Sequence, residues 1–125
     1  MDTFPSHSII PPHDVTDTAK RDELVRRMRS EGWVGSPLLT MYDPATDTLY
    51  AMMGAHRLNA AYQVKLSVPV HQGDYDTERV AFHGDEVWVD GQRLSDFSDR
   101  VLLSLFARDA VAVRLLEEES EHQGT

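Results

Sequence analysis

The residues best suited to chemistry in this sequence are Gly54-Ala55-His56-Arg57, which follow a strand-like apolar run and open a helix-like one. A glycine at such a junction lets the backbone approach a ligand closely, and the free N–H groups at the start of a helix suit an anion. His56 and Arg57 add side-chain donors at the same end. The spacing indicates an anion site, and the alternative is an ordinary helix start with two solvated cations.

Hydrophobic periodicity indicates which elements position this segment. We expect an extended, proline-containing lead-in over residues 1–15 with a short strand at 8–10. A helix should begin at Thr16 or Asp17 as N-cap and end near Glu31, before Gly32. A hairpin of strands 36–42 and 48–53 should follow, then a helix over 55–64 and a strand over 67–71.

The second half of the chain has a different pattern. Residues 79–82 and 86–89 alternate like strands of a small antiparallel meander. From Ser95 or Ser98 to about Glu119 the pattern is helical, with a break at 108–110, and its apolar residues could serve a homodimer as well as a core. The run of glutamates from Glu117 to Glu121 reads as a solvated end, and we expect residues 120–125 to be a flexible tail.

Composition limits the function. A chain of 125 residues is expected to form a single domain, and without cysteine it has neither thiol chemistry nor a Cys-ligated zinc site. The six histidines show no helical pairing, so no metal site is expected. The net charge is −9, and residues 71–125 carry 13 acidic against 5 basic side chains. We therefore do not expect duplex DNA binding, and the basic residues around Arg26 should pair with Asp22 and Glu23.

The sequence contains no apolar run of membrane-spanning length, and its first residues lack the basic and apolar regions of a signal peptide. We expect no membrane association, and a cytoplasmic protein of bacterial or phage origin.

Taken in order, these features resemble the ParB/sulfiredoxin superfamily. The resemblance covers about residues 9–72: the lead-in, Asp17-Thr18-Ala19-Lys20 opening a helix, Gly32, the hairpin, and Gly-x-His-Arg running into Ala-Ala-Tyr-Gln. It implies an α+β fold with a small mixed sheet and flanking helices. The core would span 9–72, and 73–119 would be an acidic meander with a helical extension.

In sulfiredoxins the corresponding turn holds ATP phosphates, and the nucleophilic cysteine falls on Ala55. An active sulfiredoxin is therefore ruled out, because no thiolate is present to attack. The resemblance assigns nucleotide binding to the turn and its neighbours: Lys20, Gly54, Ala55, His56, Arg57 and Asn59. Glu23 and Arg27 replace the hydroxyl residues that accompany the lysine, so the nucleotide could be ATP or CTP.

The free-serine kinases of the superfamily add a second resemblance. Their Pro-His-Glu segment, whose glutamate acts as a base, matches Pro12-His13-Asp14 here. Asp14 is thus a candidate catalytic base beside His56 and Arg57, with Mg²⁺ and a small hydroxyl-bearing substrate. The alternative is that Asp14 only caps the first helix.

Three functions remain open on the sequence. The first is an ATP- or CTP-dependent phosphotransferase or NTPase. The second is a nucleotide-dependent regulator without chemistry. The third is an acidic interaction protein or DNA mimic, which rests on the charge of residues 71–125.

Overall fold

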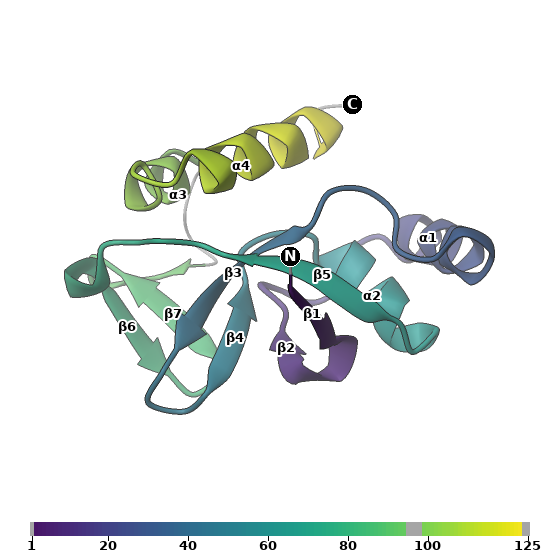
Figure 1. Ribbon diagram of the computed structural model, residues 1–125, viewed down its shortest axis with the longest axis horizontal. Helices are drawn as coiled ribbons and strands as arrows, with labels where there is room; N and C mark the ends of the chain where they lie inside the picture. Colours follow the sequence, from purple (N-terminus) through teal and green to yellow (C-terminus); the bar gives the residue numbers. More distant parts are fainter. Residues whose placement is uncertain (1, 95–98, 124–125) are drawn as a thin grey trace.

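A five-stranded mixed sheet forms the centre of the computed structural model, which describes residues 2–94 and 99–123 (Figure 1). The strands are β1 (Asp2–Pro5), β2 (Ile9–Ile10), β3 (Leu38–Asp43), β4 (Thr48–Ala51) and β5 (Ser67–Gln72). Their order in the sheet is β1-β5-β3-β4-β2. Met41 on β3 faces Tyr50 on β4 in the predicted hairpin, whereas β5 runs parallel to β3 and β2 runs parallel to β4. This arrangement confirms the predicted α+β class with a mixed sheet.

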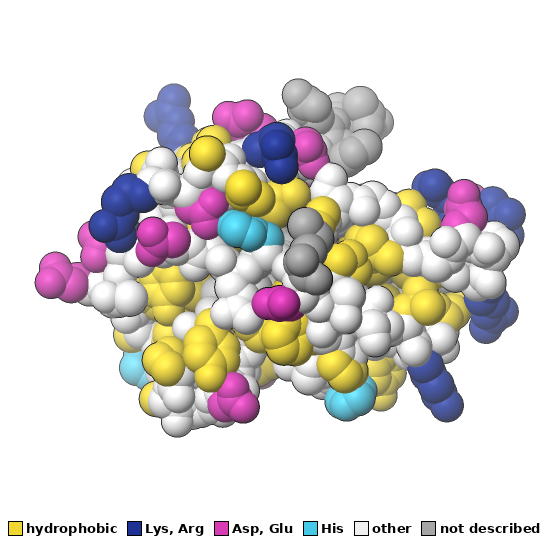
Figure 2. All heavy atoms as spheres, in the orientation of Figure 1, with side chains coloured by type: hydrophobic (Ala, Val, Ile, Leu, Met, Phe, Trp, Pro, Cys, Tyr) yellow, Lys and Arg dark blue, Asp and Glu magenta, His cyan; other side chains and the backbone are white. Residues whose placement is uncertain are grey.

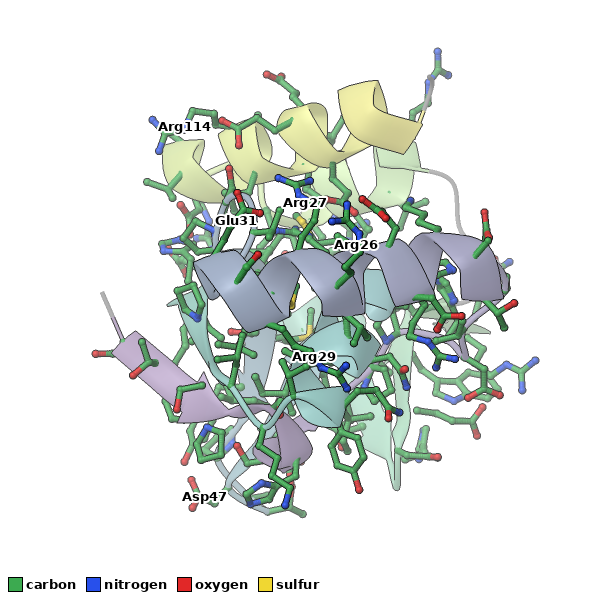
Figure 3. The ribbon with its side chains drawn as sticks, turned by 90° about the vertical axis from the view of Figure 1, so that its right-hand side faces the viewer. Arg26, Arg27, Arg29, Glu31, Asp47 and Arg114 are labelled. Carbon is green, nitrogen blue, oxygen red and sulfur yellow. The ribbon has the colours of Figure 1, made fainter. Side chains whose placement is uncertain are left out.

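Two helices, α1 (Thr18–Glu31) and α2 (Ala55–Gln63), pack against each other at one end of this sheet. Asp17 caps α1, because its carboxylate accepts the N–H of Lys20 at 3.0 Å, and Gly32 ends the helix with a φ of 82°. Figure 3 shows α1 crossing this end of the molecule, with Arg27 on the side toward α4. Both helices begin where the sequence predicts.

The second half of the chain begins with a three-stranded antiparallel sheet in the order β6-β7-β8. Strands β6 (Val80–His83) and β7 (Glu86–Val89) form the predicted meander, and β8 (Gln92–Arg93) extends it beyond the prediction. Short 3-10 turns cover Ser6–Ser8 (η1) and Thr77–Arg79 (η2).

Two helices, α3 (Asp99–Leu105) and α4 (Ala110–Gln123), complete the chain and are separated at the predicted break. Asp109 fixes the start of α4, because its carboxylate accepts the N–H of Ala112 at 3.1 Å and lies 2.8 Å from Nε2 of His71 on β5. The proposed starts at Ser95 and Ser98 lie outside the described residues.

One apolar core joins the two halves. Leu38, Leu39 and Val68 of the mixed sheet belong to the same buried cluster as Val89 and Phe106. Tyr50 on β4 stacks on Phe82 with ring centroids 5.0 Å apart, and its hydroxyl donates to the carbonyl of Gly84 at 2.5 Å. The α3–α4 pair therefore lies over the sheets as part of the same packed unit (Figure 1).

The lead-in and the end of α4 differ from expectation. Asp2–Pro5 is a strand rather than unpaired extended chain, because it pairs along the edge of β5, and α4 continues to Gln123, beyond its expected end. No helix among the described residues is long and apolar enough to cross a membrane.

Charge is divided between the two halves. The predicted ion pairs of α1 are present, with Arg21 on Asp22 and Arg26 on Glu23. Figure 2 shows Lys and Arg side chains around α1 and also over the C-terminal helices, whereas most visible Asp and Glu side chains lie over the second sheet and the C-terminal helices. Acidic side chains are therefore sparse around α1 on this face.

The junction between the sheet and α3 gives a first prediction. A Cβ on Gly73 would lie 2.5 Å from Cε1 of Phe106 and 2.9 Å from Cδ1 of Leu39. We expect Gly73→Ala to lower the free energy of unfolding by about 1–3 kcal/mol through overpacking, measured by urea denaturation. Combining it with Phe106→Leu should give less than the sum of the two single effects, and strict additivity would contradict the clash.

Candidate functional site

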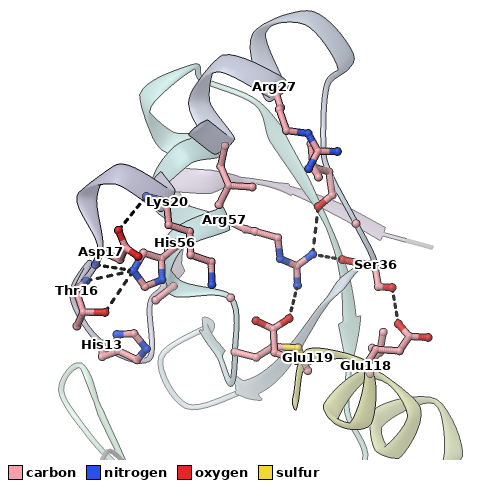
Figure 4. A pocket seen from close by; sticks show the side chains of 17 residues that line it. His13, Thr16, Asp17, Lys20, Arg27, Ser36, His56, Arg57, Glu118 and Glu119 are labelled. Atoms are coloured by element: carbon pink, nitrogen blue, oxygen red, sulfur yellow. Dashed lines mark hydrogen bonds and ion pairs between the residues drawn. The ribbon is translucent and has the colours of Figure 1, made fainter. Parts of the chain in front are cut away.

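A cavity of about 560 Å³ lies at the start of α2, where α1, the Val34–Ser36 segment and the end of α4 come together (Figure 4). The structure brings most of the predicted nucleotide-binding residues to its wall: Lys20, Gly54, Ala55, His56 and Arg57. Asp14 and Asn59 do not line this cavity.

Gly54 shapes the backbone at the head of α2. It has a left-handed conformation with φ of 73° and ψ of 35°, and a Cβ there would lie 2.5 Å from Cδ2 of Leu38. Only glycine meets both demands at little cost. The N–H groups of Ala55, His56 and Arg57 have no hydrogen-bond acceptor within residues 2–94 and 99–123. The turn therefore offers the unpaired amides that an anion would need.

His56 holds the start of α1. Its Nε2 accepts the N–H of Asp17 at 3.0 Å and that of Thr16 at 3.2 Å. This nitrogen therefore carries no proton and is already occupied by contacts within the protein. Burial lowers the pKa of His56, and the positive charge of Lys20 adds to the effect. The neutral imidazole thus joins the two helix starts through Nε2, and its proton lies on Nδ1, which has no hydrogen-bond partner among the described residues.

Arg57 is the most enclosed charged group of the cavity. Its Nη1 donates to the carbonyl of Ser36 at 2.6 Å and that of Val34 at 3.3 Å, and its Nη2 donates to Oε2 of Glu119 at 3.1 Å. Its guanidinium carbon lies 5.0 Å from the centroid of the Trp33 ring. Burial lowers the pKa of Arg57, and the carboxylate of Glu119 opposes that shift. The guanidinium is oriented toward the cavity but already has an anionic partner.

The last turns of α4 supply that partner. Glu119 is only 18% exposed, and Glu118 accepts a hydrogen bond from the Ser36 hydroxyl at 2.5 Å. The expectation that both residues belong to a solvated end is wrong. A signal was present in the sequence, because Glu118 and Glu119 follow buried Leu115 by one helical turn and so share its face.

Two further cations border the cavity. Lys20 is exposed and points into it, with no salt bridge to any described residue (Figure 4). Arg27 also lines it and pairs with Glu31 at 3.2 Å, one turn along α1. Lys20 is therefore the cation most available to a ligand.

The two remaining predicted residues lie on other faces. Asn59 accepts a hydrogen bond from Arg21 at 2.8 Å and so links α2 to α1. Asp14 is exposed and lines two smaller depressions of about 420 and 240 Å³, which it shares with His13. His13 also borders the main cavity and is the point where the three meet.

No family model and no curated protein matches the sequence. Among solved structures, sulfiredoxin from Arabidopsis thaliana is similar at 22% identity with a TM-score of 0.47, over 58% of this chain and 84% of that one.

The half-buried imidazole of His56 predicts how stability depends on pH. Because the folded-state pKa of His56 is lowered, the unfolded chain binds the proton first, so its contribution is complete above the unfolded pKa of about 6.5 and is lost as the pH falls below it. We expect His56→Gln, which keeps an acceptor, to flatten the fall in melting temperature between about pH 7.5 and 5.5. His7→Gln, at an exposed site, is the control, and an unchanged slope for His56→Gln would refute this role.

Proposed function

We propose that the protein binds the phosphates of a nucleotide, ATP or CTP with Mg²⁺, in the cavity at the start of α2. The observation that carries the proposal is the set of unpaired amides of Ala55, His56 and Arg57 in the wall of a cavity of about 560 Å³. Amides at a helix start bind phosphate through hydrogen bonds and the helix dipole. Lys20 adds an exposed positive charge on the same wall.

The residues present fit a phosphate in part. The amides, Lys20 and the guanidinium of Arg57 are the donors that a polyphosphate requires, and Gly54 allows close approach. The carboxylates of Glu118 and Glu119 lie on the same wall and would repel it. The geometry therefore supports a nucleotide-dependent regulator, in which the ligand exchanges contacts, more directly than an enzyme that is already arranged for turnover.

The role of Lys20 is testable without disturbing the fold, because its side chain is exposed. We expect Lys20→Gln to raise the Kd for the nucleotide roughly tenfold, about 1.4 kcal/mol, through loss of a charge-assisted contact. Isothermal titration with ATP, ADP, CTP and GTP in the presence of Mg²⁺ measures this.

Lys65→Gln provides the matched control for that titration, since Lys65 is exposed in the turn after α2 and does not line the cavity. Equal affinities for Lys20→Gln and the wild type would refute the assignment of Lys20. A wild type that binds none of the four nucleotides would refute the proposed function.

One observation favours phosphotransfer as a second candidate. The depression of about 420 Å³ lined by Asp14 meets the main cavity at His13, so an acceptor could lie beside the phosphates. Bound ATP or CTP would supply the phosphoryl group, and Asp14 would take the proton of the acceptor hydroxyl.

The two candidates separate by turnover. If Asp14 is the base, Asp14→Asn should lose nucleotide consumption by about 100-fold or more while keeping nucleotide affinity, as followed by release of the diphosphate. Equal rates in the variant and the wild type would exclude Asp14 as base. A wild type that binds nucleotide without consuming it would leave the regulator.

A further inference from the structure

The end of α4 holds the place in the cavity where a phosphate would meet Arg57. Glu119 reaches Nη2 of Arg57 at 3.1 Å from α4, a helix distant in the sequence, and both side chains are largely enclosed (Figure 4). A carboxylate and a phosphate offer the same kind of paired oxygens to a guanidinium. A ligand that used Arg57 would therefore have to displace Glu119.

We infer that Glu119 is an internal anion that closes the phosphate site, and that a nucleotide opens it by replacing this carboxylate on Arg57. The inference rests on the proposed function and adds its regulation. The ligand class is a polyphosphate, because the vacated position lies beside the unpaired amides of α2 and near Lys20.

The anchoring of α4 is uneven along its length. Ala112, Leu115 and Leu116 are buried in the core, and the start of the helix is fixed by Asp109 on His71 and Asp74. Glu117 is exposed, and beyond Leu116 the contacts of Glu118 and Glu119 with described residues are polar. The end of the helix can thus move while the rest stays packed.

Like charges are crowded at this end of α4. Glu117, Glu118 and Glu119 are consecutive in the helix, so their carboxylates repel one another. Glu118 has an i,i+4 contact with Arg114 at 3.9 Å, and Glu119 has the guanidinium of Arg57. When a phosphate takes Arg57, Glu119 is left beside like charge and the end of the helix is destabilised.

The test compares two substitutions that change the net charge equally. Glu119→Gln removes the internal anion, whereas Glu117→Gln removes an exposed neighbouring charge on the same helix. Affinity for ATP with Mg²⁺, for CTP with Mg²⁺ and for inorganic pyrophosphate is measured by isothermal titration. We expect Glu119→Gln to bind at least about fivefold more tightly than the wild type, and Glu117→Gln to bind within about twofold of it.

The outcomes separate this inference from the proposed function. Nucleotide binding by the wild type with no gain in Glu119→Gln would overturn the inference and leave the proposed function standing. Binding by Glu119→Gln alone would show that Glu119 closes the site but that a nucleotide does not open it in the wild type, and would overturn both. No binding by either protein would overturn both.

A second measurement uses the wild type, in case Glu119→Gln does not fold. Saturating nucleotide should speed cleavage by a glutamate-specific protease after Glu117, Glu118 and Glu119, with the fragments identified by mass spectrometry. Unchanged or slower cleavage at these sites would overturn the inference.

Discussion

The buried guanidinium of Arg57 is the interaction on which the site depends. It joins three parts of the chain that are distant in sequence: the head of α2, the Trp33–Ser36 segment and the end of α4. A guanidinium with few water contacts needs acceptors in several directions, and two carbonyls, an aromatic face and a carboxylate provide them. The close approach is built into the backbone, because a Cβ on Gly35 would lie 2.9 Å from Nη1 of Arg57. The shape of the cavity follows from these contacts.

Both basic side chains of the turn, His56 and Arg57, make structural contacts within the protein. His56 accepts the amides of Thr16 and Asp17 and so fixes one helix start against the other. Arg57 holds α4 in place, whereas the amides of the turn and the side chain of Lys20 have no partner among the described residues. Binding then becomes an exchange of Arg57 between an internal and an external anion, and an exchange of this kind makes affinity sensitive to the far end of the chain.

Local signals in the sequence were sufficient for the hairpin, an N-cap at Thr16 or Asp17, the helix start after Gly54 and the break before α4, since each depends on nearby residues. Lys20 was assigned to the same site by the resemblance, and the structure places it with Gly54 in the wall of one cavity. Local signals could not predict two further contacts, the pairing of β1 with β5 and the ion pair of Glu119 with Arg57. Both contacts join segments far apart in the chain and depend on tertiary packing. The position of Asp14 outside the main cavity could not be predicted from local signals either, because it depends on the path of the lead-in relative to the sheet.

The central claim is that a nucleotide phosphate binds the amides at the start of α2 and takes Arg57 from Glu119. Hydrogen exchange of the wild type, with and without ATP or CTP and Mg²⁺, tests this most directly because it reports both changes in one protein. The account predicts slower exchange at the amides of Ala55, His56 and Arg57 together with faster exchange at the amides after Leu116. Unchanged exchange in both segments at saturating nucleotide would contradict it.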